Sequence, residues 1–522
     1  MTASSWIHDI TLDPPSLADN TADADRLIGR LRTRVGSAEV TADLALLREI
    51  PARLRASQWR VRCLLFPERG RWRLVEVFPT KPARPAAGLA VDLGTTRVVL
   101  RLVCLQTGGT LAERAFDNPQ IEIGADVLAR IHHADRDEGL ADLHRRIIEG
   151  LNQQIASLCS GAAVKPEEIF LVSAAGNTAM THLFLGLPPY WMIREPYIPA
   201  VNRPPVIRAA EIGLELHPRC RLLAFPNIGS YFGGDLIAGL LHAGIHRSPD
   251  TAILVDVGTN AEVVLGNENW LIACAGAAGP ALEGGVTGMG MTAAPGVIDR
   301  VSVNPKTGTV DLHTIEDLPP KGICGSGLID LAAQLFLSEL IDLRGKFVPS
   351  RCGSRLIDQE GSLAFVVAEA GQSATGEALT LSQIDLDSLT RSKAAMYTIL
   401  ETLALTVGVS FADLSTFFVA GTFGSFIRPE SAVAIGMLPD IGLERYVALG
   451  NSCLEGAARI LTHPSSFEEL DRIRDRITYL ELNVNQDFMN RFSAAKFYPH
   501  TDPDRFPSVA RTAGPVRPPQ EG

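Results

Sequence analysis

Two short segments of this 522-residue chain carry the same residue types in the same order. Residues 89–100 read LAVDLGTTRVVL, and residues 253–265 read ILVDVGTNAEVVL. Each segment predicts a strand, an Asp-x-Gly-Thr turn and a second strand. The copies lie about 165 residues apart, a spacing typical of a duplicated domain.

The residue types in these turns suit a polyphosphate. Glycine can take positive φ and lets the backbone approach an anion, while successive N–H groups and threonine hydroxyls donate to phosphate oxygens. Asp92 and Asp256 at the strand ends suit a Mg²⁺ ion that keeps much of its water. The predicted phosphate ligands are Gly94, Thr95 and Thr96 in the first turn and Gly258, Thr259 and Asn260 in the second. One copy alone could be an ordinary hairpin; two copies favour phosphate binding.

A third segment, residues 417–425 (FFVAGTFGS), predicts an apolar strand that runs into a glycine-rich turn. Such a turn can lie flat against a nucleobase and ribose, so Gly421, Thr422 and Gly424 are candidate nucleotide contacts. The same pattern also occurs as a plain strand-to-helix connection.

The elements around these turns predict an α/β chain with a smaller module in front. Alternating apolar residues at 59–66 and 72–78 predict a hairpin, and residues 25–35 and 41–56 predict helices. The expected parts are a flexible lead-in (1–20), a small α+β module (21–85), a first half (86–250), a second half (251–500) and a disordered tail (501–522).

Composition excludes several classes of protein. Apolar residues make up 46%, so the chain can build real cores. A net charge of -11 argues against nucleic acid or an anionic membrane as the main partner. No apolar run is long enough to span a bilayer, and the N-terminus has no signal pattern, so we expect a cytoplasmic protein.

The eight cysteines are scattered along the chain without a C-x-x-C pair. Neither a zinc site nor a plant-type iron–sulfur loop can be built within one segment. We therefore expect most of them to be small core residues in a reducing compartment.

The order of these motifs resembles the actin, sugar-kinase and heat-shock-chaperone (ASKHA) ATPases, which implies a duplicated RNase H-like fold. Within that superfamily the chain is most similar to the reductive activators of corrinoid-dependent methyltransferases and related corrinoid proteins. The matching segments are 118–120 (NPQ), 124–127 (GADV), 175–186 (AGNTAMTHLFLG), 233–235 (GGD), 278–284 (AGPALEG), 322–330 (GICGSGLID), 435–439 (IGMLP) and 450–456 (GNSCLEG).

The resemblance implies an ATPase that binds a corrinoid protein of a methyltransferase system and drives inactive Co(II) to Co(I). It implies ATP and Mg²⁺ as cofactors, and homodimerisation. It also points to Asp235 as general base, with a helix cap as the alternative. Glu283 would face nucleotide or metal, or stabilise a turn. Gly325, Ser326 and Gly327 would line the nucleoside side.

Other residues in the matching segments have less defined roles. Asn177 carries no clear assignment, and His182 more readily faces the core than reacts. Asn118, Gln120 and Asp126 have the look of exposed residues and are candidate partner contacts.

The sequence departs from the family at its front, where members typically carry a ferredoxin-like [2Fe–2S] domain. Four clustered thiolates would be needed, so we expect no iron–sulfur cluster in this chain and a separate ferredoxin-like electron donor. Two alternatives are an ATPase that has lost redox coupling, and a cluster that Cys324 shares with a symmetry mate. A small-molecule kinase and a nucleotide-regulated binding protein are the competing functions.

Overall fold

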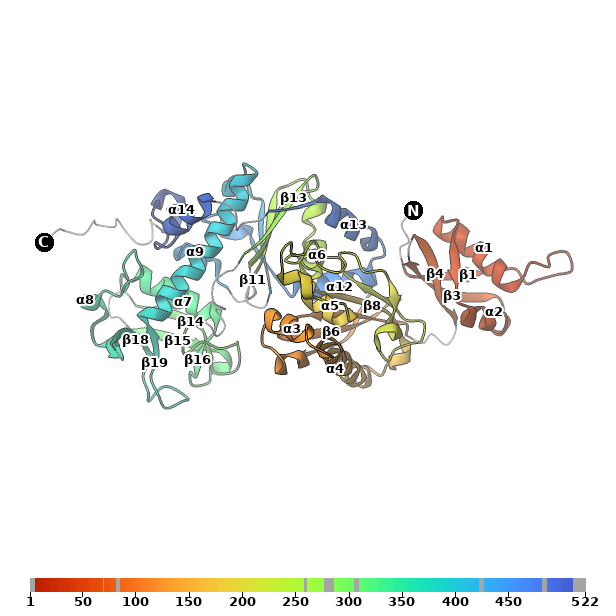
Figure 1. Cartoon of the computed structure of the whole chain (residues 1–522), viewed down its shortest axis with the longest axis horizontal. Coiled ribbons are helices and arrows are strands. Elements are labelled where there is room, and N and C mark those ends of the chain that lie inside the picture. The colour runs from red at the N-terminus through yellow and green to blue at the C-terminus, as the bar shows by residue number, and fades with distance from the viewer. Residues whose placement is uncertain are drawn as a thin grey trace. The chain divides into compact units, whose positions relative to one another are not determined.

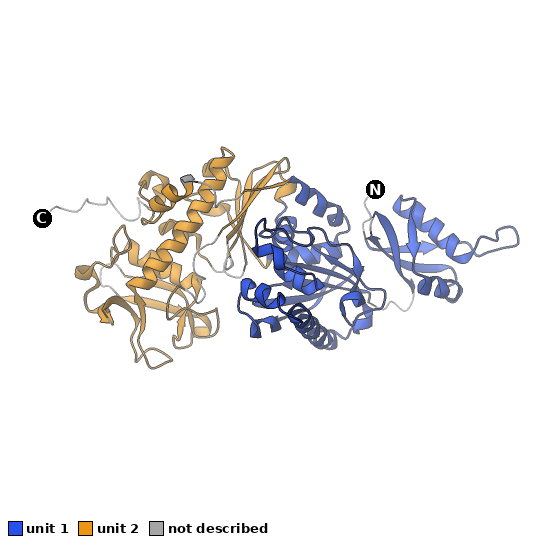
Figure 2. Cartoon of the chain, viewed as in Figure 1, with its two compact units in different colours: residues 1–244, 452–476 blue, residues 245–451, 477–522 orange. Residues whose placement is uncertain are grey.

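The computed structural model describes residues 5–68, 70–80, 85–257, 261–276, 286–304, 309–359, 361–421, 427–480 and 486–509. The chain divides into two compact units (Figure 2). The first comprises Met1–Gly244 and Ser452–Arg476, and the second comprises Ile245–Asn451 and Ile477–Gly522. No helix in these described ranges is both long enough and apolar enough to cross a bilayer.

The small module at the start of the first unit is a four-stranded sheet with two helices (Figure 1). Its strand order is β1-β3-β4-β2. Leu27 and Leu31 of the first helix, and Leu46, Ile50 and Leu54 of the second, are buried at helical spacing. The elements are β1 (Ile7–Thr11), α1 (Asp23–Val35), β2 (Val40–Ala42), α2 (Leu44–Ala56), β3 (Arg60–Glu68) and β4 (Arg71–Pro79).

The prediction of a flexible lead-in over residues 1–20 is wrong for the part that forms β1. This strand pairs antiparallel with β3, and its residue Ile10 is buried. Trp6 is 1% exposed, and its indole N–H donates to Ile460 O at 2.9 Å. A buried tryptophan with a partner for its polar atom anchors the segment. The sequence predicted flexibility because most of the neighbouring residues are polar.

The module is attached to the rest of its unit by a buried ion-pair cluster. The Glu76 carboxylate pairs with Arg219, Arg53 and His217. Burial raises the pKa of Glu76, but these partners outweigh it and lower that pKa to about 2. The carboxylate therefore stays charged and joins the module to the first half.

Five strands of each large sheet repeat one topology within the described residues, and the sixth strand, β9 or β22, is added at a different edge. Their orders are β7-β6-β5-β8-β10-β9 and, in the reverse direction, β22-β13-β12-β11-β20-β21. In each, three antiparallel strands form a meander, and two later strands continue it in parallel from the first. The duplicated α/β fold predicted from the paired turns is confirmed.

The strands of the first sheet are β5 (Ala87–Leu93), β6 (Arg97–Cys104), β7 (Thr110–Asp117), β8 (Ile169–Gly176), β9 (Ile207–Arg208) and β10 (Arg221–Ala224). Those of the second are β11 (Ala252–Val257), β12 (Ala261–Gly266), β13 (Leu271–Gly276), β20 (Thr416–Ala420), β21 (Tyr446–Gly450) and β22 (Ile477–Tyr479).

The halves differ in what connects the meander to the parallel strands. In the first, the connection contains α3 (Val127–Ala134) and α4 (Gly139–Gly161), and α5 (Thr178–Leu185) and α6 (Gly234–Ala243) follow β8 and β10. In the second, the connection includes two three-stranded sheets and α9. Its elements are β14 (Val297–Val303), β15 (Val310–Thr314), β16 (Gly322–Ile323), α7 (Gly325–Leu337), α8 (Pro349–Cys352), β17 (Leu356–Gln359), β18 (Ser362–Ala368), β19 (Leu379–Ser382) and α9 (Gln383–Thr406).

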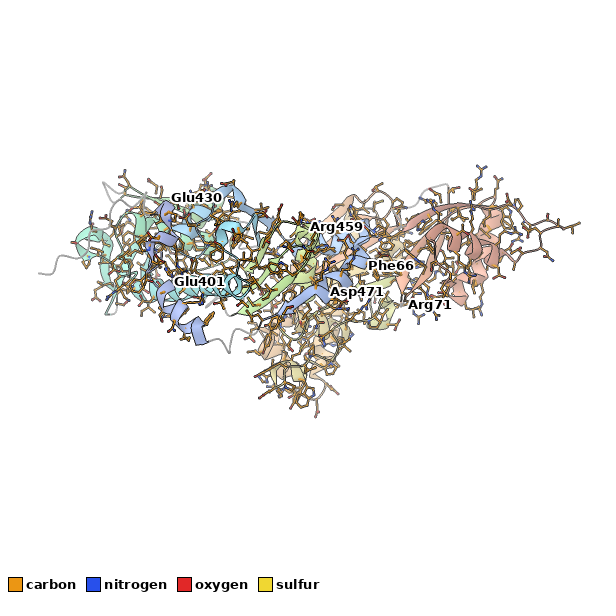
Figure 3. All side chains as sticks on the ribbon, turned by 90° about the horizontal axis from the view of Figure 1, so that it is seen from above. Phe66, Arg71, Glu401, Glu430, Arg459 and Asp471 are labelled. Carbon is orange, nitrogen blue, oxygen red and sulfur yellow. The ribbon has the colours of Figure 1, made fainter. Side chains whose placement is uncertain are left out.

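A late segment of the chain returns to the first unit. Helices α12 (Ser452–Thr462) and α13 (Ser466–Arg476) pack on α6, and α12 also packs on β5 and β8. Phe66 meets Phe467 edge to face, with ring centroids 5.5 Å apart, in the region where Figure 3 labels Phe66 and Asp471. The contiguous second half expected at 251–500 is therefore wrong at these helices.

The C-terminal part of the second unit is ordered further than expected. Helices α11 (Pro429–Ala434) and α14 (Gln486–Ala495) precede a short segment in which Phe506 and Val509 are buried in the core. The prediction of a disordered tail is wrong for 501–509, because these side chains are apolar anchors. Residues 510–522 lie outside the described residues.

Candidate functional site: two matched turns at the ends of the first strands

The first turn joins β5 to β6, and Asp92 lies one residue before the end of β5. Gly94 does not take the left-handed conformation expected of it. A Cβ atom there would lie 2.1 Å from Arg97 O. Glycine is thus required because the two strands approach each other closely at the turn.

Side chains from three other elements hold this turn from behind. Asn118 Nδ2 donates to Gly94 O at 2.9 Å, and Arg130 Nη2 donates to Thr95 O at 2.7 Å. Asn177 Nδ2 donates to Thr95 Oγ1 at 3.0 Å. Because that hydroxyl oxygen is the acceptor, its hydrogen can still be donated to an anion.

We call Asn118, Gln120, Arg130 and Asn177 the bracket. Gln120 completes it: its Oε1 lies 3.3 Å from Arg130 Nη1, and its Nε2 donates to Leu143 O. Asn118 and Gln120 are 2% and 1% exposed, so the prediction that they are exposed partner contacts is wrong.

Asp126 differs from these two in being exposed. Its carboxylate accepts from Ala129 N–H at 2.8 Å and caps α3. A contact with a partner stays a prediction for this residue. Arg130 lies on α3, four residues after Asp126, and was not among the predicted site residues. Its position one helix turn after the GADV motif was the available signal.

Asp235, the predicted general base, lies beside the first turn. It is the second residue of α6, whose N-cap is Gly233, so the alternative of an N-cap does not describe its position. A Cβ on Gly233 would lie 2.5 Å from both Asn177 Cα and Asp235 Oδ1. Asp235 is therefore a close neighbour of the bracket residue that holds Thr95; its role as base stays a prediction.

The second turn repeats the strand register of the first. Asp256 lies opposite Ala420 of the parallel strand, as Asp92 lies opposite Ala175. Gly421, which follows, has φ +84°, and a Cβ there would lie 2.8 Å from Asp256 Oδ1. The predicted site residues Gly258, Thr259, Asn260, Glu283, Thr422 and Gly424 lie outside the described residues.

The cross-strand neighbours of the two aspartates differ. Asp92 lies opposite Val99, whereas Asp256 lies opposite Glu262, which the sequence reading did not single out. Directly opposed residues share one face of a sheet, and like charges there repel. A cation beside Asp256 would relieve that repulsion.

These carboxylates suit Mg²⁺ in their chemistry. The ion takes oxygen ligands and commonly keeps several waters, so one or two carboxylates suffice. Among the described residues no group of three His, Cys, Asp or Glu side chains could form an all-protein metal site. Asp92 in the first unit, and Asp256 with Glu262 in the second, are each suited to a largely hydrated ion.

The segment predicted to face the nucleoside begins α7. Gly325, Ser326 and Gly327 are buried, and a Cβ on Gly327 would lie 2.4 Å from Ile298 O of β14. Cys324 Sγ donates to that same carbonyl at 3.3 Å. These residues pack α7 closely against β14. Contact with a nucleoside stays a prediction. The Cys324 thiol donates to a carbonyl of its own unit.

His182 faces the core, as its apolar surroundings suggested. Its Nδ1 lies 2.7 Å from Thr178 O and its Nε2 accepts from Val201 N–H at 3.3 Å. Burial lowers the pKa of this imidazole, so it serves as a neutral packing residue. The cysteines are also core residues: seven of the eight are buried, and Cys104 is partly buried.

Two sheets share a five-stranded arrangement, with an aspartate next to the end of each first strand and a glycine at the end of the neighbouring parallel strand. This combination is that of an ASKHA-type protein. Residues 250–510 match the family model described as the C-terminal ASKHA domain of RACo. Residues 87–248 match the RACo middle region, and residues 1–83 match the RACo linker region. The chain therefore belongs to the RACo family of corrinoid activation proteins, which confirms the family predicted from its motifs.

Relatives and a solved structure agree with this assignment. The chain is 30% identical to the corrinoid activation enzyme RamQ of Eubacterium limosum, over 80% of this chain and 72% of that protein. It is 24% identical to the [Co(II) methylated amine-specific corrinoid protein] reductase of Methanosarcina barkeri, over 77% and 75%. A reductive activator for corrinoid, iron-sulfur protein superposes with TM-score 0.84 at 35% identity, over 96% of this chain and 80% of that one.

Proposed function

We propose that this chain hydrolyses ATP to drive reduction of an inactive Co(II) corrinoid protein to Co(I). The supporting observation is the matched register of Asp92 and Asp256 in the first strands of the two large sheets, in a chain of the RACo family. Turns of this composition suit the phosphate oxygens of a nucleotide.

The reaction transfers one electron. A separate ferredoxin-like protein gives up the electron, cobalt gains it, and ATP and water become ADP and phosphate. A potential gap of about 300 mV corresponds to about 7 kcal/mol for one electron. Hydrolysis of ATP is a source of that size.

The chain's own residues would position the nucleotide and the water. Thr95 and the backbone N–H groups of the first turn would bind phosphate oxygens, and Asp235 would orient the attacking water and accept its proton. Mg²⁺ would neutralise phosphate charge, and Asp92 and Asp256 are the candidate carboxylates for it. Nucleotide-dependent changes in the units would then be sensed by the docked corrinoid protein.

The partner would be the corrinoid protein of a methyltransferase system in the cytoplasm, and the activator would act as a homodimer. The Methanosarcina relative is named for a methylated amine-specific corrinoid protein, so such proteins are the first substrates to test.

The decisive experiment mixes Co(II) corrinoid protein, this chain, Mg-ATP and either reduced ferredoxin or a chemical reductant. We expect the absorption of Co(I) to appear with ATP and not with a non-hydrolysable analogue. No ATP-dependent Co(I) with any of several carriers would contradict the proposal. Transfer of phosphate to a metabolite, assayed in parallel, would favour a kinase instead.

A further inference from the structure

A fully buried arginine without a carboxylate partner lies under the first turn. Arg130 is 0% exposed, and within the described ranges no acidic side chain lies within ion-pair distance of its guanidinium. Its hydrogen bonds go to uncharged acceptors: Nε to Gly124 O at 2.9 Å, Nη1 to Gln120 Oε1 and to Met180 Sδ, and Nη2 to Thr95 O. Burial lowers the pKa of Arg130 to about 10, and the charge of the exposed Asp126 only partly opposes that shift.

This arrangement is unusual because a buried charge normally has a counter-charge. The same unit shows the usual solution: Arg221, 4% exposed, pairs with Asp43 and Glu68. Arg221 begins β10, so it lies at the edge of the sheet opposite to the turn, where the parallel strands start rather than end. Of the two buried arginines, the one at the turn lacks an acid.

We infer that Arg130 is a positioning residue for polyphosphate, with the anion bound on the first turn as its counter-charge. The inference rests on the proposed function, since it assigns a ligand to the same turn. The guanidinium fixes the Thr95 carbonyl and places a positive charge behind the N–H groups that face the anion. In a water-poor interior the charge of the Arg130 guanidinium attracts an anion on the first turn more strongly than it would in water.

The test compares binding of ADP and of inorganic pyrophosphate by full-length wild type, Arg130→Lys, Arg130→Gln and Arg221→Gln. We expect Arg130→Gln to raise the Kd of both ligands about tenfold or more, with Arg130→Lys in between because it keeps the charge but loses the planar donors. Arg221→Gln should lower the melting temperature while the Kd stays that of wild type.

The rise in melting temperature caused by the anion provides a second measurement. A purely structural role of Arg130 would leave that rise unchanged. Pyrophosphate should raise the melting temperature of wild type and Arg221→Gln, and this increment should shrink in Arg130→Gln. Wild-type Kd in Arg130→Gln, or equal losses in both glutamine variants, would overturn the inference and leave the proposed function standing. If Arg130→Gln does not fold, Arg130→Lys decides by the same Kd measurement. Absence of nucleotide binding by wild type would refute the proposed function itself.

Discussion

The two halves of this protein share a backbone frame and use it differently. The next-to-last residue of each first strand is an aspartate, paired with an alanine on the parallel strand in the same register. In the first half the aspartate faces valine across the hairpin and the turn is held by the bracket; in the second it faces a second carboxylate. Duplication preserved the strand register around the two aspartates, while the residues that face them across the hairpins diverged.

The comparison predicts that removal of the aspartate in the second half costs more activity than removal of the aspartate in the first half. Replacement of Asp256 by alanine should abolish phosphate release and ATP-driven Co(I) formation, a loss of roughly 10²- to 10³-fold or more, because charge stabilisation at the phosphates is worth several kcal/mol. Rates of both reactions measure it. Asp92→Ala is the matched variant in the first half and should lose less of both rates. Intact Co(I) formation by Asp256→Ala would contradict the assignment.

A second test adds one methyl group at the equivalent glycines. In Gly421→Ala the new Cβ meets the Asp256 carboxylate and φ is +84°; in Gly176→Ala it meets Leu93 Cβ at 2.7 Å. Each should lose about 1–3 kcal/mol of stability from overpacking. Only Gly421→Ala should lose ATPase activity beyond its loss of stability, which denaturant titration and phosphate assays would separate. Equal activity losses would remove the distinction.

A third test exchanges the cross-strand neighbours. Val99→Glu places a carboxylate opposite Asp92 and should destabilise the chain by up to about 1 kcal/mol without divalent ions. Glu262→Gln should have the opposite sign and should raise the Mg²⁺ concentration required for hydrolysis. Melting curves with and without MgCl₂ measure the first effect, and Mg²⁺ titration of the ATPase the second. An unchanged Mg²⁺ requirement would exclude Glu262 from the ion's surroundings.

The smallest effect concerns pH. Burial lowers the pKa of His8, His182 and His242 in the first unit and of His500 in the second. The folded chain binds protons at these rings less readily than the unfolded chain does. The free energy of unfolding is therefore unaffected by them above about pH 6.5 and decreases as pH falls below that value. Thermal unfolding between pH 7.5 and 5 should show the loss, and His182→Gln should reduce it. A stability that rises in this range would contradict the assignment.

The sequence predicted the duplication because its signals are local. An Asp-x-Gly-Thr turn between two apolar strands is readable within about twelve residues, and two copies supply the period. The bracket was not predicted because its polar side chains look solvent-exposed in isolation. The buried Asn118 side chain donates to the carbonyl of Gly94, a turn residue 24 positions earlier, and no local pattern shows that this carbonyl needs a donor.

The return of α12 and α13 to the first unit could not be predicted either. It depends on fit between distant segments: a Cβ on Gly456 would lie 2.0 Å from Ala238 O, so α12 approaches α6 at a glycine. Nothing local distinguishes that glycine from others in helices. The alternation that predicted β3 and β4 succeeded, by contrast, because it encodes burial directly.

The position of α12 in the chain has a consequence for synthesis on the ribosome. Residues up to Gly244 emerge first, yet the helix that packs on β5 and β8 begins at Ser452. At 5–20 residues per second the delay is roughly 10–40 s. During that time part of the first sheet, including the surface at Gly88 that Leu461 later contacts, awaits its cover. The nascent chain is therefore an expected client of ribosome-associated chaperones, and the first half expressed without residues 452–476 should aggregate.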